Sequence, residues 1–461
     1  MNSNIREHLS AKHTFCKRTA VCCIYALLLV TAYLWYVGSE GYGSLFEAKK
    51  ALFTYMHAVF IALFAVAALV DSTNTQCDFK PNRIPLMPVA LSFCYTVVVW
   101  VSDLKSWYWP RVLDNMEYYG ECTIVVTIYT MVFILLAMWL KPSRLLFVCF
   151  VLSVGGNAIV CILQTIGVNP LGLYRGGIFF GLGDGLYYQG QYTGTIGNSN
   201  FTSELLAMSV CIVVAYMILS EGSKRFLLLM PILLCAYAMF SIDADQGTVA
   251  ALVTVFLFCV FVLCKDTKVK AAICVLGVVV ILVALCCIYF FVEAVDFTYP
   301  VSPSAIRQLR ELLHGNFSPK LATGRVGLWA ETIARIPNRF YWGYGSQSMI
   351  WADFPPSTRH SVEQGMCLES RPAAAHNIYL NIWYSNGIFA LLLYVILLVW
   401  CAYKWLRLAH RSKDVAALGC GIVSWSVQGL FAVSNITITP YFWLLLALYL
   451  PAVKSAELAD K

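Results

Sequence analysis

The sequence predicts an all-α integral membrane protein with about 12 transmembrane helices and one large, partly helical extracytoplasmic loop between helices 9 and 10. Of its 461 residues, 60% are hydrophobic and only 12% are charged, whereas roughly a quarter are charged in soluble domains. Apolar runs of about 20 residues, the length that crosses a bilayer core, recur along the chain. One long segment, 294–375, interrupts them. This composition fits lipid as the solvent.

Each predicted span is an apolar run that can satisfy its own backbone hydrogen bonds as a helix. The predicted spans are 19–37, 51–70, 85–101, 121–140, 144–166, 200–219, 226–242, 247–264, 271–292, 377–403, 415–433 and 440–453. The first run follows a basic start but lacks a small-residue cleavage site, so we expect a retained helix. Three regions result: N-terminal helices in 1–293, the loop in 294–375, and C-terminal helices with a tail in 376–461.

Lysine and arginine predict the orientation, because they stay preferentially on the cytoplasmic side of short connections. The basic groups on alternate connections are Lys80/Arg83, Lys141/Arg144, Lys224/Arg225, Lys265/Lys268/Lys270, Lys404/Arg407/Arg411/Lys413 and Lys454/Lys461. Both termini should therefore be cytoplasmic, in a multi-pass protein of the cytoplasmic (inner) membrane. Loop 294–375 should lie outside, since long loops translocate largely regardless of charge.

The cysteines and the net charge exclude several classes of function. Most of the 18 cysteines lie in predicted spans, where Cys behaves as a small hydrophobe. Cys367 is the one cysteine of the large loop, which therefore has no internal disulfide framework. No CxxC or HExxH pattern suggests zinc. The formal charge of +7 follows topology and does not indicate nucleic-acid binding.

Two polar segments precede the large loop on the predicted outer face. In the glycine-rich stretch 167–200, Asn198 and Asn200 stand where a helix N-cap would offer N–H groups to an anion; an ordinary flexible loop is the alternative. Asp243 and Asp245 resemble a DxD pair that holds a divalent metal on a sugar nucleotide. Two isolated aspartates are more typical of solvated turns and helix caps, so we predict no metal site and no cofactor.

The large loop should be folded, because it contains the amphipathic pieces AIRQLRELLHG and TGRVGLWAETIARIP. In the second piece Val326 and Trp329 share one face, while Arg325 begins the helix near its positive dipole end. His376 stands at the threshold of the tenth span. It is either a wet boundary residue or a titratable base that faces an outer cavity.

Several of these motifs together resemble the O-antigen ligase and polymerase superfamily of WaaL- and Wzy-like membrane glycosyltransferases. His376-Asn377, nine residues and then Gly387 are similar to its H-N-x9-G signature. The other matching elements are Gly324-Arg325 with Trp329, Gly343-x-Gly345 after Pro337, Gly194 to Asn200, Ser102-Asp103 and Gly120-Glu121. Where the family often has Ser-Arg-Gly, this chain reads Asp245-Gln246-Gly247, so a commonly pyrophosphate-binding arginine is replaced by Gln246.

The resemblance implies transfer of a glycan from an undecaprenyl-diphosphate donor to an acceptor hydroxyl, in surface polysaccharide or lipopolysaccharide biosynthesis at the cell envelope. His376 is the candidate base and Arg325 the candidate diphosphate clamp. The candidate substrate-binding residues are Asn377, Arg175, Asn198, Asn200, Arg335, Arg339 and Arg371. The expected partners are the lipid-linked donor, a glycan, lipid or protein acceptor, and membrane lipids.

Two other classes stay open at this point. A transporter or lipid-glycan flippase would also have about a dozen helices, but it should carry polar groups at the bilayer midplane and an internal repeat. Few charges lie inside the predicted spans, and the two halves show no clear repeat. A catalytically inactive scaffold of envelope assembly is favoured only by Gln246. Ligases, polymerases and protein O-glycosyltransferases are not separated by these motifs.

Overall fold

A computed structural model describes residues 16–73, 80–114, 119–173, 192–242, 244–293, 305–319, 321–322, 324–354, 357–361 and 366–459. Within these ranges the chain is mostly helical, with two short antiparallel sheets. The prediction of an all-α membrane protein is therefore confirmed. The division at residues 293 and 375 stays a prediction.

The helices follow one another along the chain with short connections. The elements up to residue 165 are α2 (Lys17–Leu28), η1 (Leu29–Tyr33), η2 (Gly41–Gly43), α3 (Leu45–Thr73), α4 (Leu86–Leu104), α5 (Arg111–Asp114), α6 (Thr123–Trp139) and α7 (Arg144–Thr165). The next are β1 (Tyr192–Thr193), β2 (Gly197–Asn198), α8 (Ser199–Leu219), η3 (Ser223–Leu228), α9 (Leu229–Ser241), α10 (Asp245–Leu257), η4 (Phe258–Leu263) and α11 (Thr267–Phe291). The last are α12 (Ala305–Leu313), α13 (Arg325–Arg335), η5 (Ile336–Arg339), η6 (Ser348–Ile350), β3 (Ser357–Ser361), β4 (Met366–Ser370), α14 (Ile378–Leu408), α15 (Lys413–Gln428) and α16 (Thr439–Leu458).

A helix occurs at each predicted span. Among the described residues, nine helices are long and apolar enough to cross a bilayer, counting η3 with α9 and η4 with α10. The other predicted spans coincide with α2 and η1, with α6, and with α15, which are shorter. For these three, membrane crossing stays a prediction, and so does the count of twelve.

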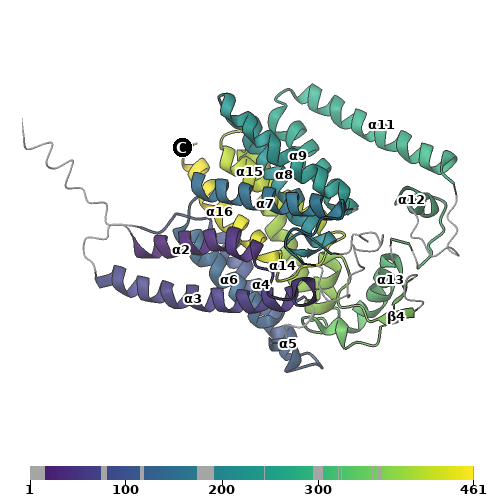
Figure 1. The fold of residues 1–461 in the computed structure, drawn as a ribbon, viewed down its shortest axis with the longest axis horizontal. Coiled ribbons are helices and arrows are strands. Elements are labelled where there is room, and N and C mark those ends of the chain that lie inside the picture. Colours follow the sequence, from purple (N-terminus) through teal and green to yellow (C-terminus); the bar gives the residue numbers. More distant parts are fainter. Residues whose placement is uncertain are drawn as a thin grey trace, which may run out of the picture.

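The bundle is built around α8, which packs against α9, α10 and α15. Helix α14 packs against α4 and α15, and α6 packs against α16. The start of α2 and the end of α16 lie at the end of the bundle away from α12, α13 and β4 (Figure 1). Helix α11 runs along the margin, and none of its residues is buried within the described protein (Figure 1). Its apolar side chains suit contact with lipid.

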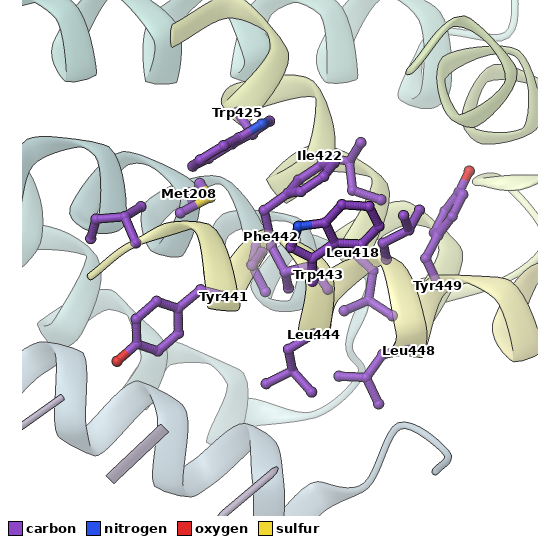
Figure 2. Packing of buried hydrophobic residues seen from close by; sticks show 14 of the residues in the cluster. Met208, Leu418, Ile422, Trp425, Tyr441, Phe442, Trp443, Leu444, Leu448 and Tyr449 are labelled. Carbon is purple, nitrogen blue, oxygen red and sulfur yellow. The ribbon is translucent and has the colours of Figure 1, made fainter. Parts of the chain in front are cut away.

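Close helix packing holds the middle of the bundle, because lipid is as apolar as the side chains and offers no hydrophobic drive for association. The indole of Trp425 stacks on Phe442 with ring centroids 5.0 Å apart and donates to the hydroxyl of Tyr394 at 2.8 Å (Figure 2). A side chain at Gly421 would meet Ile212 of α8 at 2.9 Å. This glycine therefore allows α15 to approach α8 closely, and α15 holds the end of α8 that bears the site.

The extramembrane segment is folded where it is described. Its two amphipathic pieces form α12 and α13, as predicted. Helix α13 ends at Arg335, just before Pro337, and continues as the short 3-10 turn η5. Strands β3 and β4 pair antiparallel, with Ser357 opposite Ser370 and Ser361 opposite Met366. This hairpin was not predicted, because its sequence has no regular alternation of apolar and polar residues.

We predict that a cysteine replacing Ser318, between α12 and α13, is labelled by a membrane-impermeant maleimide on intact cells. A cysteine replacing Ser412, at the start of α15, should not be labelled until the membrane is permeabilised, because it follows the basic group that ends at Arg411. Both substitutions are made in a background cleared of reactive thiols. Equal labelling at the two positions on intact cells would contradict the predicted orientation.

Candidate functional site

His376 lies in a turn that immediately precedes α14 and has an unusual backbone conformation. Its φ is +50°, a left-handed value that costs a non-glycine residue roughly 1 to 3 kcal/mol unless the surroundings enforce it. On one side, the N–H of Ala375 donates to Asn381 Oδ1 at 3.2 Å, and its carbonyl accepts from Trp329 Nε1 at 2.8 Å. These bonds fix the backbone that carries the half-buried imidazole.

Asn377 fixes the other side of the same turn. Its side-chain oxygen accepts from the N–H of Leu380 at 2.9 Å and so caps α14. The N–H of Ile378 donates to the carbonyl of Gly429 at 2.7 Å, which joins the turn to the end of α15. The side-chain oxygen of Asn377 thus has a folding role, and its predicted role in substrate binding stays a prediction.

Arg325 is the first residue of α13, after Gly324, which takes the left-handed conformation at φ +86°. Arg325 and Trp329 are one helical turn apart, so their side chains share a face. The Trp329 ring lies 6.2 Å from that of Phe431 and bonds to the carbonyl of Ala375. The face of α13 that bears Arg325 is therefore turned toward the His376 segment and the end of α15.

A buried acid, Glu204, lies beneath these groups on α8. Its side chain is 0% exposed. Glu204 Oε1 accepts from Gln246 Nε2 at 3.4 Å, and the same amide donates to the carbonyl of Asn200 at 3.3 Å. The positive charge of Arg325 acts on the Glu204 carboxyl. Glu204 Oε2 has no hydrogen-bond partner among the described residues.

Gln428, at the end of α15, connects Glu204 with the His376 turn. It is 1% exposed, and its Nε2 donates to the backbone carbonyl of Glu204 at 3.4 Å and to Ser424 Oγ at 3.0 Å. The next residue, Gly429, accepts the hydrogen bond from Ile378. Elements far apart in sequence therefore meet here: α8, α10, α13, the start of α14 and the end of α15.

The glycine motifs form a backbone clasp. Gly387 interrupts α14 at φ +81°, and the N–H groups of Tyr344 and Gly345 donate to the carbonyls of Tyr384 and Ser385 at 2.9 and 2.7 Å. A Cβ at Gly387 would overlap the carbonyl of Tyr341. Only glycine fits where the strand of loop after η5 lies directly on the broken helix.

Ser102 and Asp103 close the same clasp from α4. Asp103 Oδ1 accepts from the N–H of Ser346 at 2.7 Å, and its other oxygen accepts from the hydroxyl of Thr123. The Ser102 hydroxyl bonds to the carbonyl of Ser385 at 3.1 Å. These motif residues therefore act through folding: they anchor the loop on the bundle.

The segment from Gly194 to Asn200 is a tight hairpin, β1 with β2, that leads into α8. Asn157 Oδ1 accepts from the N–H and hydroxyl of Thr195 at 2.7 and 2.9 Å. Asn198 Oδ1 accepts from the N–H of Asn200 at 2.9 Å, so that N–H is bonded within the cap. The predicted roles of Asn198 and Asn200 in substrate binding stay predictions.

Two predicted arginines have structural partners. Arg335 pairs with Glu331 at 2.7 Å and lies on the Phe354 ring at 4.3 Å. Arg339 lies 4.1 Å above the Trp107 ring and donates to the carbonyl of Lys105 at 3.3 Å. Both tie the loop to itself or to the bundle. Arg371 is exposed, and Arg175 lies outside the described residues.

The acidic turn before α10 is described in part. Asp245 is the exposed first residue of α10, whereas Asp243 lies outside the described residues. Gln246 is 8% exposed and is turned into the bundle toward Glu204. Gly247 packs directly on Ser203, which brings α10 against α8. No group of three or more His, Cys, Asp or Glu side chains suited to a metal occurs within the described ranges.

The fold and this site define an integral membrane protein with a polar, cationic site at the end of its bundle that carries α12 and α13. Residues 193–395 match the family model described as O-antigen ligase. The match runs from β1 into α14 and includes Glu204, Gln246, Arg325 and His376. It confirms the predicted resemblance: the chain belongs to the O-antigen ligase and polymerase superfamily of membrane glycosyltransferases. No curated protein matches the sequence.

We predict that Gly387→Ala lowers the thermal stability of the detergent-solubilised protein by more than about 1 kcal/mol, because it adds both left-handed strain and a clash with Tyr341. Gly167→Ala is the matched control. Gly167 has φ +85°, but nothing lies within 4 Å of its added Cβ. Equal losses of stability in the two variants would contradict the clasp.

Proposed function

We propose that the chain transfers a glycan from an undecaprenyl-diphosphate donor to an acceptor hydroxyl on the outer face of the cytoplasmic membrane, as an O-antigen ligase or a surface-polysaccharide polymerase. The observation that carries this proposal is the hydrogen bond of 2.8 Å from Trp329 Nε1 to the carbonyl of Ala375. It holds the helix that begins at Arg325 against the turn of His376. A cation and a titratable base are thereby combined in one site.

The chemistry needs a base for the acceptor and a cation for the leaving group. His376 takes the proton of the acceptor hydroxyl as that oxygen bonds to the anomeric carbon of the donor sugar. The bond between this carbon and the diphosphate oxygen breaks, and the diphosphate leaves with the electron pair. Arg325 stabilises the negative charge that develops there, since a guanidinium offers paired N–H donors to phosphate oxygens.

The half-buried setting of both residues supports this assignment. A site that is partly removed from water strengthens the attraction between a guanidinium and a diphosphate. His376 is also held in a strained conformation by bonds on both sides, and such strain clusters at active sites. The acceptor is a lipid, a glycan or a protein hydroxyl. Offering each of the three to the purified protein with labelled donor identifies it.

We predict that His376→Ala and Arg325→Ala each lower glycan transfer by at least about a hundredfold, the lower range for loss of a general base or a charge-stabilising donor. The measurement is incorporation of labelled undecaprenyl-linked glycan into acceptor by purified, reconstituted protein. His314→Ala is the control, because His314 packs on Tyr289 at 4.0 Å, away from the motifs of the site. His360→Ala is a second control.

Conservative variants should separate the two roles. Arg325→Lys keeps the charge without the two-pronged geometry, so partial activity should remain. His376→Gln keeps a hydrogen-bonding group but cannot hold the proton, so it should be as inactive as His376→Ala. Wild-type transfer by His376→Ala would show that His376 is not the base. A wild-type protein inactive toward every acceptor would favour the scaffold.

We predict that transfer survives EDTA, because the permanent charge of Arg325 already balances the departing diphosphate and no step requires a metal ion. The matched variant is Asp245→Asn, which removes a carboxylate from the start of α10 and should stay near wild type. Loss of transfer in EDTA with recovery in Mg or Mn, together with a loss in Asp245→Asn, would overturn the metal-free scheme.

A further inference from the structure

Glu204 is an acid in the interior of an apolar helix, and the reaction described above does not use it. Its neighbours on α8 are almost all apolar or small, and the side chain is fully buried. An unpaired carboxylate in such a position is strongly unfavourable, so a buried acid usually has a partner that justifies it. The cation that acts on Glu204 is Arg325.

The hydrogen bonds around Glu204 leave one of its oxygens for that cation. Oε1 accepts from Gln246 Nε2 at 3.4 Å, which sets the orientation of the carboxyl group. Oε2 has no hydrogen-bond partner among the described residues. Gln428 bonds to the backbone carbonyl of Glu204 at 3.4 Å and fixes this turn of α8 against α15. The carboxyl is thus held rigidly, with one oxygen still able to accept a hydrogen bond.

We propose that Glu204 is a positioning residue that holds the Arg325 guanidinium where the donor diphosphate binds; this inference rests on the proposed function. A guanidinium has five N–H donors in a fixed fork, so it can keep one edge toward a carboxylate while another binds phosphate oxygens. A side chain held in this way loses little freedom when the donor arrives. Gln246 acts one step further out, since it orients Glu204.

The test is a double-mutant cycle between Glu204 and Arg325 in the reconstituted full chain, read out as kcat/KM for the labelled lipid-linked donor. Glu204→Gln preserves the volume and the hydrogen bond to Gln246 but removes the charge. We expect this variant to lose about tenfold or more, a modest effect for a misplaced catalytic group. In the Arg325→Ala background, the same change should alter the residual rate by less than about twofold.

Glu311→Gln is the matched control. Glu311 is also a buried acid beside an arginine, with Arg310 Nη1 at 2.7 Å, but it lies on α12 and belongs to the loop. It should leave kcat/KM near wild type in both backgrounds. Thermal melting of each variant in detergent confirms that the comparison is made between folded proteins.

The outcomes separate this inference from the proposed function. A similar loss from Glu204→Gln in both backgrounds, or no loss in the wild-type background, would overturn the positioning role and leave the proposed function standing. Wild-type activity of Arg325→Ala would remove the clamp itself and overturn both. A loss confined to the background with Arg325 is the result that the inference predicts.

Discussion

The hydrogen bond between Trp329 Nε1 and the carbonyl of Ala375 is the contact on which the site depends. Arg325 belongs to a helix outside the predicted spans, and His376 belongs to the entry of α14, so nothing in the covalent chain fixes their relation. The indole closes this gap. It sits one turn after Arg325 and bonds to the residue before His376, and its ring lies on Phe431 at the end of α15. The loop helix is therefore held against the bundle at the position where the chemistry is proposed.

The family motifs divide into two groups with different physical roles. Ser102, Asp103, Gly343, Gly345 and Gly387 form the clasp that joins the loop after η5 to α4 and to the break in α14. The second group consists of Arg325 and His376, which carry the proposed chemistry. A motif match therefore reports first on the way the loop is anchored. The activity depends on two side chains whose backbone that anchoring holds in place.

The sequence predicted the helices well, because the length and apolarity of a span are local properties that hydrogen bonding in lipid enforces. The amphipathic face of α13 was equally readable, since Trp329 falls where the 3.6-residue period places it. Glu204 and Gln428 were missed. Their partners lie 42 and 224 residues away from Glu204 in the chain, and no periodic pattern encodes such pairs. The available signal was the single acid within the run SELLAMSV, since an ionisable residue inside a span indicates function by default. Gln246 was noticed only as a departure from the family, and its burial against Glu204 gives that departure a physical context.

The most direct test of the central claim, that Arg325 and His376 form one donor site, is an experimental structure of the protein with undecaprenyl diphosphate bound in a lipid nanodisc. We expect phosphate oxygens within hydrogen-bond distance of the Arg325 guanidinium, with the imidazole of His376 facing the terminal phosphate, where the donor sugar would be attached. A diphosphate bound elsewhere on the outer face, with Arg325 and His376 both outside contact, would contradict the claim.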